Sequence, residues 1–490
     1  MLSENQIMLF RATKMVNMFT AGSVMALVTA CAAIPDTSKP LPMLKQAELQ
    51  SNESVDKSDG IPGQWPGDKW WITYGDSQLN ALEEEALRGS PTLAAARARL
   101  QQAIAGSAEA RSSLYPSVNA TGSLKPTRQS YHNGVPIDAV PVGWNNSASL
   151  MLNLSYEIDL FGKNQALARA AGNERAAALA EMYQSKLTLS VAIANTWATL
   201  LGQNRELTLA QDTVRLRHNS LELVSRLYRQ GMETADKVSQ SRSELATARA
   251  RLEAKEEQLL ITRHQIAALL GAGPDRDLSI HLPSEAKIPV RGLPGNLSSD
   301  LLAHRPDIIS ARYQAEAAAE RIKVAHANFY PSINLTAMIG KQVLGLDYFD
   351  HSDSRTGSWG PSFTLPIFEG GALRARYRES TAAYDEAVSV YNETLIEALR
   401  DVADTLTRLS RIQAQLDYSR EAAQEAEHSW SLASQRYKAG LATYLDVLTA
   451  ENTLISSREQ VNDYEKQAFQ RDIAVNRALG GGFSSASIND

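Results

Sequence analysis

Residues 147–163, with the sequence SASLMLNLSYEIDLFGK, decide the fold of this chain. From Leu150 to Leu160 every even-numbered residue is apolar, whereas the odd-numbered residues are mostly small or polar, apart from Met151. A period of two is typical of a β-strand with one face in an apolar medium. An alanine-rich and charge-rich run follows, and it contains no proline until Pro274. The sequence therefore predicts a strand that passes directly into a very long helix.

The residues before this strand predict two helices and the first strand of a β-hairpin. The helices cover about 76–87 and 92–114, and each ends at a break that contains proline. Val118 and Ala120 then alternate with polar residues, as in a short strand. A loop rich in proline, glycine and asparagine leads from there to the strand quoted above. We therefore expect a β-hairpin over about 117–160.

A long helical hairpin is expected over about 163–272. If this run folds as two limbs, a limb of about 60 residues would be about 90 Å long. The second limb carries a strict heptad of apolar residues, and the residues three positions after them are small or polar. The heptad consists of Val238, Leu245, Leu252, Leu259 and Ile266. Its seam is therefore narrow and closely packed, unlike that of an isolated leucine zipper.

The second half of the chain repeats the first. A helix that begins near Pro306 and ends at Tyr330-Pro331 lies 215 residues after its counterpart. A β-hairpin at about 332–368 and a helical hairpin at about 370–479 follow it. The heptad recurs at Val447, Leu454, Val461, Ala468 and Val475. We predict an internal duplication with a first repeat at 76–273, a linker at 274–300, a second repeat at 301–480 and a C-terminal tail at 481–490.

The N-terminus has the layout of a secretory signal. Arg11 and Lys14 precede a short apolar stretch that ends in Val-Thr-Ala-Cys31. This ending resembles a bacterial lipobox, in which the cysteine is acylated and becomes the mature N-terminus. We therefore predict a lipoprotein signal peptide at 1–30, lipidation at Cys31 and an extended tether at 31–75. The alternative is an ordinary signal peptide with an incidental cysteine.

Composition excludes several classes of function. A net charge of -6 gives no basis for a nucleic-acid partner. No run of about 18 apolar residues predicts a membrane-spanning helix. The single cysteine rules out an internal disulfide and a thiolate metal cluster. We find no serine-hydrolase, phosphate-loop or zinc-protease motif, so we expect no enzyme activity and no cofactor except the covalent lipid on Cys31.

Two residue clusters are interpreted as structural. Trp65, Trp70, Trp71 and Tyr74 form an aromatic cluster that we expect to pack in a core. Glu83-Glu84-Glu85 is interpreted as a charged helix face, in preference to a carboxylate site.

Four amphipathic strands per chain are too few to close a barrel, and open sheet edges are not tolerated in hydrocarbon. If the strands lie in a membrane, several copies of the chain must share one barrel. The narrow heptad seams suit helices packed side by side into a cylinder. Shared strands, a lipid anchor and helices longer than a membrane is thick therefore indicate a hollow conduit.

Motifs along the whole mature chain resemble the TolC-like outer-membrane factor family, in its OprM/NodT-type lipoprotein branch. The matching motifs are Val-Thr-Ala-Cys31, Trp70-Trp71-x-x-Tyr74, Gly75-Asp76-x-Gln78-Leu79-x-x-Leu82, Ser90-Pro91-Thr92-Leu93, Ala110-Arg111-x-x-Leu114-Tyr115-Pro116, Ser155 to Gly162, Arg305-Pro306-Asp307 and Ala478 to Gly482.

The resemblance implies a mostly α-helical fold with a small β part. Four transmembrane β-strands per chain would complete a trimeric barrel, which a long α-helical coiled-coil tunnel continues across the periplasm. It also implies a homotrimer in contact with outer-membrane lipid, a periplasmic adaptor protein and an inner-membrane transporter of the RND type. The chain departs mildly from the pattern at Pro366, near the end of the fourth strand.

The same resemblance suggests where a gate would lie. In this family the periplasmic end of the tunnel narrows where the helical hairpins turn, partly through acidic rings. We expect Asp401 and Asp404 at about that level, as a candidate gate, although both could be ordinary exposed residues. Gly231 and Gly440, each with a threonine three residues later, are expected to allow close helix packing or a local bend, and the grooves around them could receive an adaptor.

We conclude from the sequence that the chain is the bacterial outer-membrane channel subunit of a tripartite efflux system for drugs, solvents or other small toxic compounds. One alternative is the outer-membrane conduit of a type I protein secretion system. The other is a lipid-anchored periplasmic scaffold without a pore.

Overall fold

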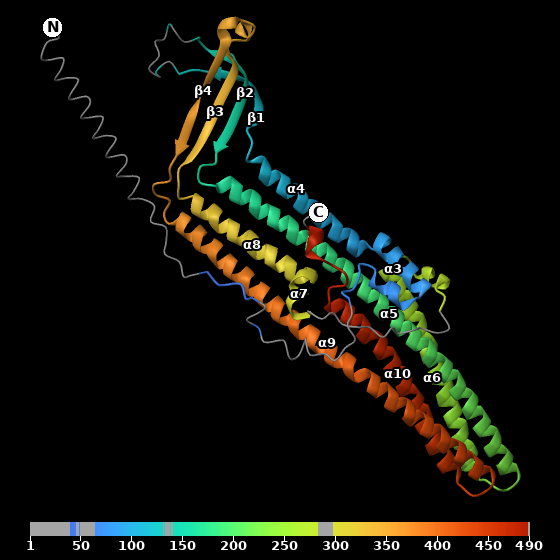
Figure 1. Ribbon diagram of the computed structural model, residues 1–490. Helices are drawn as coiled ribbons and strands as arrows, with labels where there is room; N and C mark the ends of the chain where they lie inside the picture. The colour runs from blue at the N-terminus through green and yellow to red at the C-terminus, as the bar shows by residue number, and fades with distance from the viewer. Residues whose placement is uncertain are drawn as a thin grey trace, which may run out of the picture. The chain divides into compact units, whose positions relative to one another are not determined.

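The computed structural model describes residues 40–45, 49, 64–130, 132, 138, 141–282 and 297–488 (Figure 1). The predicted signal peptide, Cys31 and most of the predicted tether lie outside these residues. The chain divides into two compact units. Of the described residues, those within 1–43, 101–176 and 312–390 form the first unit, and those within 44–100, 177–311 and 391–490 form the second.

The first unit holds a single four-stranded antiparallel sheet in the order β1-β2-β3-β4 (Figure 1). Its strands are β1 (Ser117–Arg128), β2 (Trp144–Ile158), β3 (Ser332–Leu344) and β4 (Arg355–Thr364). The central pair β2–β3 joins the two repeats, with Leu152 opposite Ile339. Within the described residues, β1 and β4 each pair along one edge only.

One face of this sheet is apolar and exposed, as the period of two predicts. Val118, Leu152, Ile339 and Phe363 on this face are 63%, 52%, 66% and 80% exposed. The register places polar residues such as Asn153 on the opposite face, where its amide donates to Thr121 Oγ1 at 2.9 Å. No helix in the described part of the chain is both long and apolar enough to span a membrane.

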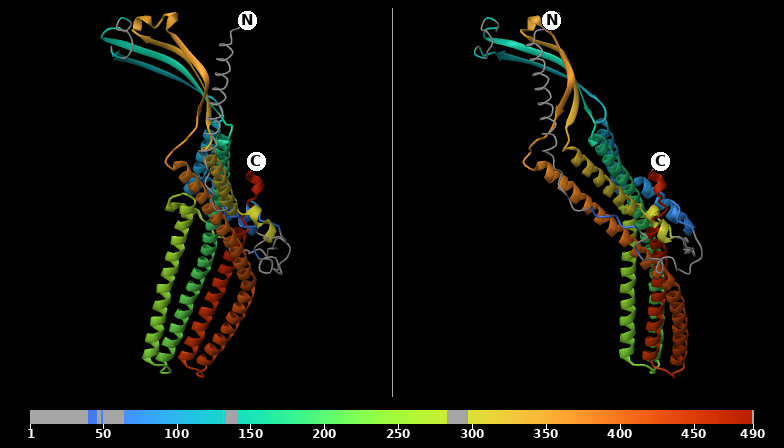
Figure 2. Two further views of the ribbon diagram at one scale, coloured as in Figure 1. Left: turned by 90° about the vertical axis from the view of Figure 1, so that its left-hand side faces the viewer. Right: turned by 60° about the vertical axis from the view of Figure 1, so that its left-hand side comes forward.

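The helices repeat in order, and every pair except α3 and α7 also repeats in length. Figure 2 shows the green hairpin of the first repeat beside the orange and red hairpin of the second. The paired helices are α3 (Ser77–Gly89) with α7 (Leu297–His304), α4 (Pro91–Ser112) with α8 (Pro306–Ala327), α5 (Lys163–Arg229) with α9 (Ala372–Lys438), and α6 (Ala235–Leu269) with α10 (Tyr444–Ala478). Both α4 and α8 have 22 residues and begin at a proline, which is favoured at the first helical position because its missing N–H would be unpaired there anyway.

The two limbs of each helical hairpin are unequal. Helices α5 and α9 have 67 residues each, whereas α6 and α10 have 35 each. At 1.5 Å per residue the longer limbs measure about 100 Å and the shorter about 50 Å. The sequence did not predict the lengths of the two limbs, because the apolar heptads of the shorter limb do not show where the longer limb begins or ends. Short 3-10 segments complete the described chain at Trp70–Tyr74, Pro274–Ser279, Leu346–Tyr348, Ser352–Ser354 and Ser485–Ile488.

The core of the second unit forms around the predicted aromatic cluster. Trp70 and Trp71 are 2% and 1% exposed, and they lie in one apolar cluster with Trp197. The Trp197 indole N–H donates to Asp76 Oδ2 at 2.8 Å, while Asp76 Oδ1 caps α3. The prediction that this cluster packs in a core is therefore confirmed for Trp70, Trp71 and Tyr74. Trp65 is only half-buried and stacks on His304 outside that core.

The expected charged face at Glu83-Glu84-Glu85 is wrong for its first member. Glu83 is fully buried, and neither of its carboxylate oxygens has a hydrogen-bond partner among the described residues. It follows Leu79 and Leu82 on the buried side of α3, so the helical period places it inward. Burial raises the pKa of Glu83 to about 9, and the side chain is neutral at pH 7. Glu84 is exposed and pairs with Lys69 at 2.9 Å.

Candidate functional site

The ends of the two helical hairpins form the first part of the candidate site. The chain reverses at residues 230–234 and 439–443, and at Gly231 and Gly440 the backbone φ values are +71° and +73°. The N–H of Met232 bonds to the Leu227 carbonyl at 2.9 Å, which closes the helix end in a Schellman motif. A Cβ at either glycine would meet nothing within 4 Å. Close helix packing is therefore not their role, and the left-handed turn is.

A small core holds the two turns together. It contains Val224 and Val238 of the first hairpin and Tyr437, Tyr444, Val447 and Leu448 of the second. The Tyr437 hydroxyl donates to Glu233 Oε1 at 2.9 Å, so one hydrogen bond joins the two hairpins at their ends. Burial and the Glu233 carboxylate both raise the pKa of Tyr437, which keeps the phenol protonated as the donor.

A buried ion pair joins the same hairpins farther from the turns. Arg217 of α5 and Glu451 of α10 have side chains that are 5% and 1% exposed, and Nη1 lies 2.8 Å from Oε1. Arg217 also donates to Asn452 Oδ1, and Ser220 donates to Glu451 Oε2 at 3.1 Å. Burial raises the pKa of Glu451, although the Arg217 charge opposes this shift. Removing one partner of such a pair leaves an uncompensated buried charge.

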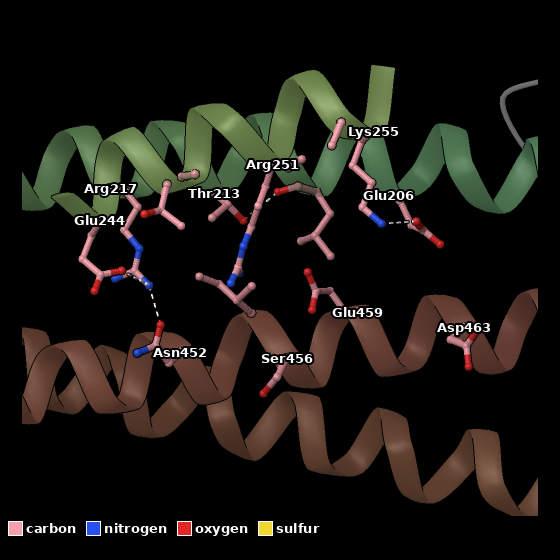
Figure 3. A pocket seen from close by; sticks show the side chains of 16 residues that line it. Glu206, Thr213, Arg217, Glu244, Arg251, Lys255, Asn452, Ser456, Glu459 and Asp463 are labelled. Carbon is pink, nitrogen blue, oxygen red and sulfur yellow. Dashed lines mark hydrogen bonds and ion pairs between the residues drawn. The ribbon is translucent and has the colours of Figure 1, made fainter. Parts of the chain in front are cut away.

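A groove of about 560 Å³ begins beside this pair and runs between α5, α6 and α10 (Figure 3). In Figure 3, Arg251 extends from α6 into the groove, and Glu459 lies across from it on α10. Lys255 Nζ contacts Glu206 Oε2 at 2.7 Å on the α5–α6 side. Because charges of both signs line the groove, it suits the polar surface of a protein better than an apolar small molecule. No metal-binding cluster is found among the described residues.

The predicted gate residues lie elsewhere. Asp401 is 37 residues before the last residue of α9, which places it about 55 Å from the hairpin turn. The expectation that Asp401 and Asp404 mark the turn is therefore wrong. It failed because the unequal limbs put the turn near residue 440.

Asp401 of α9 instead contacts α10 and the residue that connects α7 to α8. Its carboxylate accepts from Arg477 Nη2 at 2.6 Å and from Arg305 Nη1 at 3.3 Å. Arg305 is also bound by Asp307 at 2.6 Å. Burial would lower the pKa of Arg305, but Asp307 and Asp401 outweigh it and raise that pKa, so the guanidinium stays charged. Asp404 is 56% exposed and lies 3.8 Å from Arg408.

Sequence reasoning missed the residues that join the hairpins. Tyr437 precedes Gly440 and Thr443 just as Tyr228 precedes Gly231 and Thr234, and this repeated pattern is a usable signal for a turn at Gly440. Nothing in that motif identified Glu233 as its partner. Nothing in the sequence predicted the buried ion pair of Arg217 and Glu451, because isolated charged residues on long helices are usually solvated.

Comparisons with known proteins agree with this architecture. A family model described as outer membrane efflux protein matches residues 82–272 and 297–481. The fusaric acid resistance protein FusA of Burkholderia cepacia is 32% identical over 366 residues, which cover 74% of this chain and 68% of that protein. The toluene efflux pump outer membrane protein TtgF of Pseudomonas putida is 30% identical over 468 residues, covering 94% and 96% of the two chains. The crystal structure of the outer membrane protein VceC from Vibrio cholerae is similar with a TM-score of 0.81 and 38% identity, over 86% of this chain and 100% of that one.

Proposed function

The chain belongs to the outer membrane efflux protein family, and from that premise we propose that three copies of it form one channel within a tripartite efflux system. Members of this family are outer-membrane transport channels and not enzymes. The predictions of a TolC-like fold, an outer-membrane location and an efflux function are therefore confirmed.

The sheet of the first unit carries the proposal of a shared barrel. Among the described strands, β1 and β4 have unpaired outer edges, and one sheet face exposes large apolar side chains. Unpaired backbone groups at a sheet edge are costly in hydrocarbon, so the edges require partner strands. A trimer supplies them if β4 of one copy pairs with β1 of the next.

We propose that the hairpin ends form the closable part of the channel and that a periplasmic adaptor binds the groove beside them. In the described part of the chain the ends are held by the Tyr437–Glu233 hydrogen bond and a small core, and opening would require these contacts to rearrange. The groove exposes Arg251 and Glu459, which suits a helical adaptor with charges of both signs. The adaptor would connect the channel to an inner-membrane transporter of the RND type.

The names of the relatives support export of small toxic compounds. They include a fusaric acid resistance protein and a toluene efflux protein. These names favour small-compound export over the alternative of protein secretion. The exported class would be small apolar or amphipathic molecules.

We also propose that Cys31 carries the lipid anchor. The Leu41 N–H donates to Asp385 Oδ1 of α9 at 2.9 Å, which fixes the chain against that helix. Ten residues separate Cys31 from Leu41, and they can span at most about 35 Å. Asp385 lies 13 residues, or about 20 Å, after the start of α9, so the anchor can reach the sheet end of this helix.

Recordings from planar bilayers test this proposal. The purified full chain should elute as a trimer, resist dissociation until heated and give discrete conductance steps. A protein that stays monomeric, or that never inserts, would favour the scaffold alternative. Metabolic labelling with palmitate should mark the wild type and fail in Cys31→Ala, and labelling of that variant would refute lipidation at this residue.

A further inference from the structure

Two cations face each other on the apolar face of the sheet. Lys341 of β3 pairs directly with Arg355 of β4, and Lys341 also pairs with Leu150 of β2. Directly opposed residues point to the same face, and Leu150 is 54% exposed on the apolar one. Like charges directly opposite each other destabilise a strand pair unless something compensates them.

The level of this pair on the sheet follows from the strand geometry. Eight residues separate Leu150 from Ile158 at the helix end of β2, which is about 26 Å along the strand. If the strand is tilted by about 40° from the membrane normal, this length spans about 20 Å of membrane thickness. The apolar band of outer-membrane barrels has a similar height of about 25 Å. The two cations therefore lie near the border of the band that is farther from the helices.

The loop between β3 and β4 marks the same border independently. Val343, the next residue on this face of β3, is only 6% exposed. Lys341 Nζ donates to the Phe349 carbonyl at 2.9 Å and lies 5.4 Å from the centre of the Phe349 ring. The loop of residues 345–354 begins immediately beyond the cations, and it carries Asp347, Asp350 and Asp353 beside the exposed side chains of Leu346 and Tyr348. Arg355 is exposed, and its side chain has no hydrogen bond or ion pair within the described part of the chain.

We infer that Lys341 and Arg355 bind a phosphate group of the phosphorylated glycolipid in the outer leaflet of the outer membrane. Arg355 supplies a planar pair of N–H donors suited to phosphate, and Lys341 supplies an ammonium held in place by the loop. The acyl chains of the same lipid would lie against the apolar rows below. The inference rests on the proposed channel function, in which the helical hairpins are periplasmic and the loop end of the sheet lies outside the cell.

Lipid binding to the purified trimer tests the inference, with lipid A as the probe. Lys341→Gln/Arg355→Gln should bind lipid A at least about tenfold more weakly than the wild type, because two charge-assisted contacts are lost. Arg355→Lys keeps the charge but loses the planar pair of donors, so its affinity for lipid A should lie between those of the wild type and the double variant. Lys125→Gln is the matched control, since Lys125 pairs with Ser147 on the opposite face of the sheet. It should leave lipid A binding within about twofold of the wild type.

Further binding measurements identify the ligand. Dephosphorylated lipid A should bind the wild type as weakly as lipid A binds the double variant. Equal binding of the phosphorylated and dephosphorylated lipids, or an equal loss in Lys125→Gln, would overturn the inference. Equal competition by phosphatidylglycerol vesicles or by inorganic phosphate would overturn the assignment to the outer-leaflet glycolipid. Conductance of the same preparations separates these results from a failure of the channel itself.

Discussion

Substitution of Asp401 distinguishes a structural residue from a gate. The carboxylate is 23% exposed and accepts hydrogen bonds from Arg477 and Arg305. Hydrogen bonds to charged groups contribute about 1.5–3 kcal/mol each. Arg477 is 46% exposed and can be solvated, while Arg305 keeps Asp307 as a partner. Asp401→Asn should therefore lower the free energy of unfolding by about 2 kcal/mol, less than the loss expected for an orphaned buried charge.

Asp404→Asn is the matched control on the same helix. Asp404 is 56% exposed, and its contact with Arg408 is an exposed pair one turn away. Such pairs contribute about 0–1 kcal/mol, so this variant should unfold close to the wild-type midpoint. Guanidinium unfolding of the trimer in detergent measures both variants.

Single-channel recordings of the same two variants complete the test. Because the two aspartates lie about 50–55 Å from the hairpin turn, neither substitution should change the conductance of inserted trimers. An enlarged conductance in both variants, with unchanged stability, would refute the structural role and restore the gate that the sequence suggested.

Three further substitutions, two of them with a control variant, test other features of the chain. Tyr437→Phe removes the hydrogen bond between the hairpin ends, so inserted channels should be open for a larger fraction of time, and an unchanged open fraction would contradict the proposed closure. Burial raises the pKa of Glu83 from 4.5 to about 9, so between these two pH values the folded chain keeps a proton that the unfolded chain has lost. The free energy of unfolding of the wild type should therefore fall as the pH rises from about 4.5 to about 9. Glu83→Gln should remove that fall and be more stable by roughly 3 kcal/mol at pH 7, whereas Glu84→Gln should keep it. Gly480→Ala would place a Cβ 1.8 Å from a backbone carbonyl oxygen at a φ of +82°, and it should prevent stable trimer formation. Gly106→Ala is the control: its Cβ would meet no atom within 4 Å, and the substitution should stabilise the helix by about 0.5–1 kcal/mol.

Patterns with a short period could be predicted from the sequence alone. The alternation in residues 150–160 identified both the strand and its apolar face, because neighbouring side chains in a strand point to opposite faces whatever the rest of the chain does. The same holds for the prolines that begin α4 and α8, whose effect acts through their own backbone. The duplication was visible because the two repeats keep one register over long stretches.

Pairings between distant side chains could not be predicted in this way. Whether Asp401 faces Arg305 or solvent depends on the rotation of α9 at a point many turns from its ends, and small changes in helix twist accumulate over that distance. The inward position of Glu83 likewise depends on which side of α3 the core covers.

The sequence by itself determined the strand faces, the repeated order of helices and strands and the family, because local periodicity and ordered motifs carry that information. Only the tertiary structure decided where the helical hairpins turn, that Asp401 is a structural ion-pair residue, that Tyr437 holds the hairpin ends and that Lys341 opposes Arg355. Each of these depends on two or more segments far apart in the chain meeting in one register, and no single segment encodes that register.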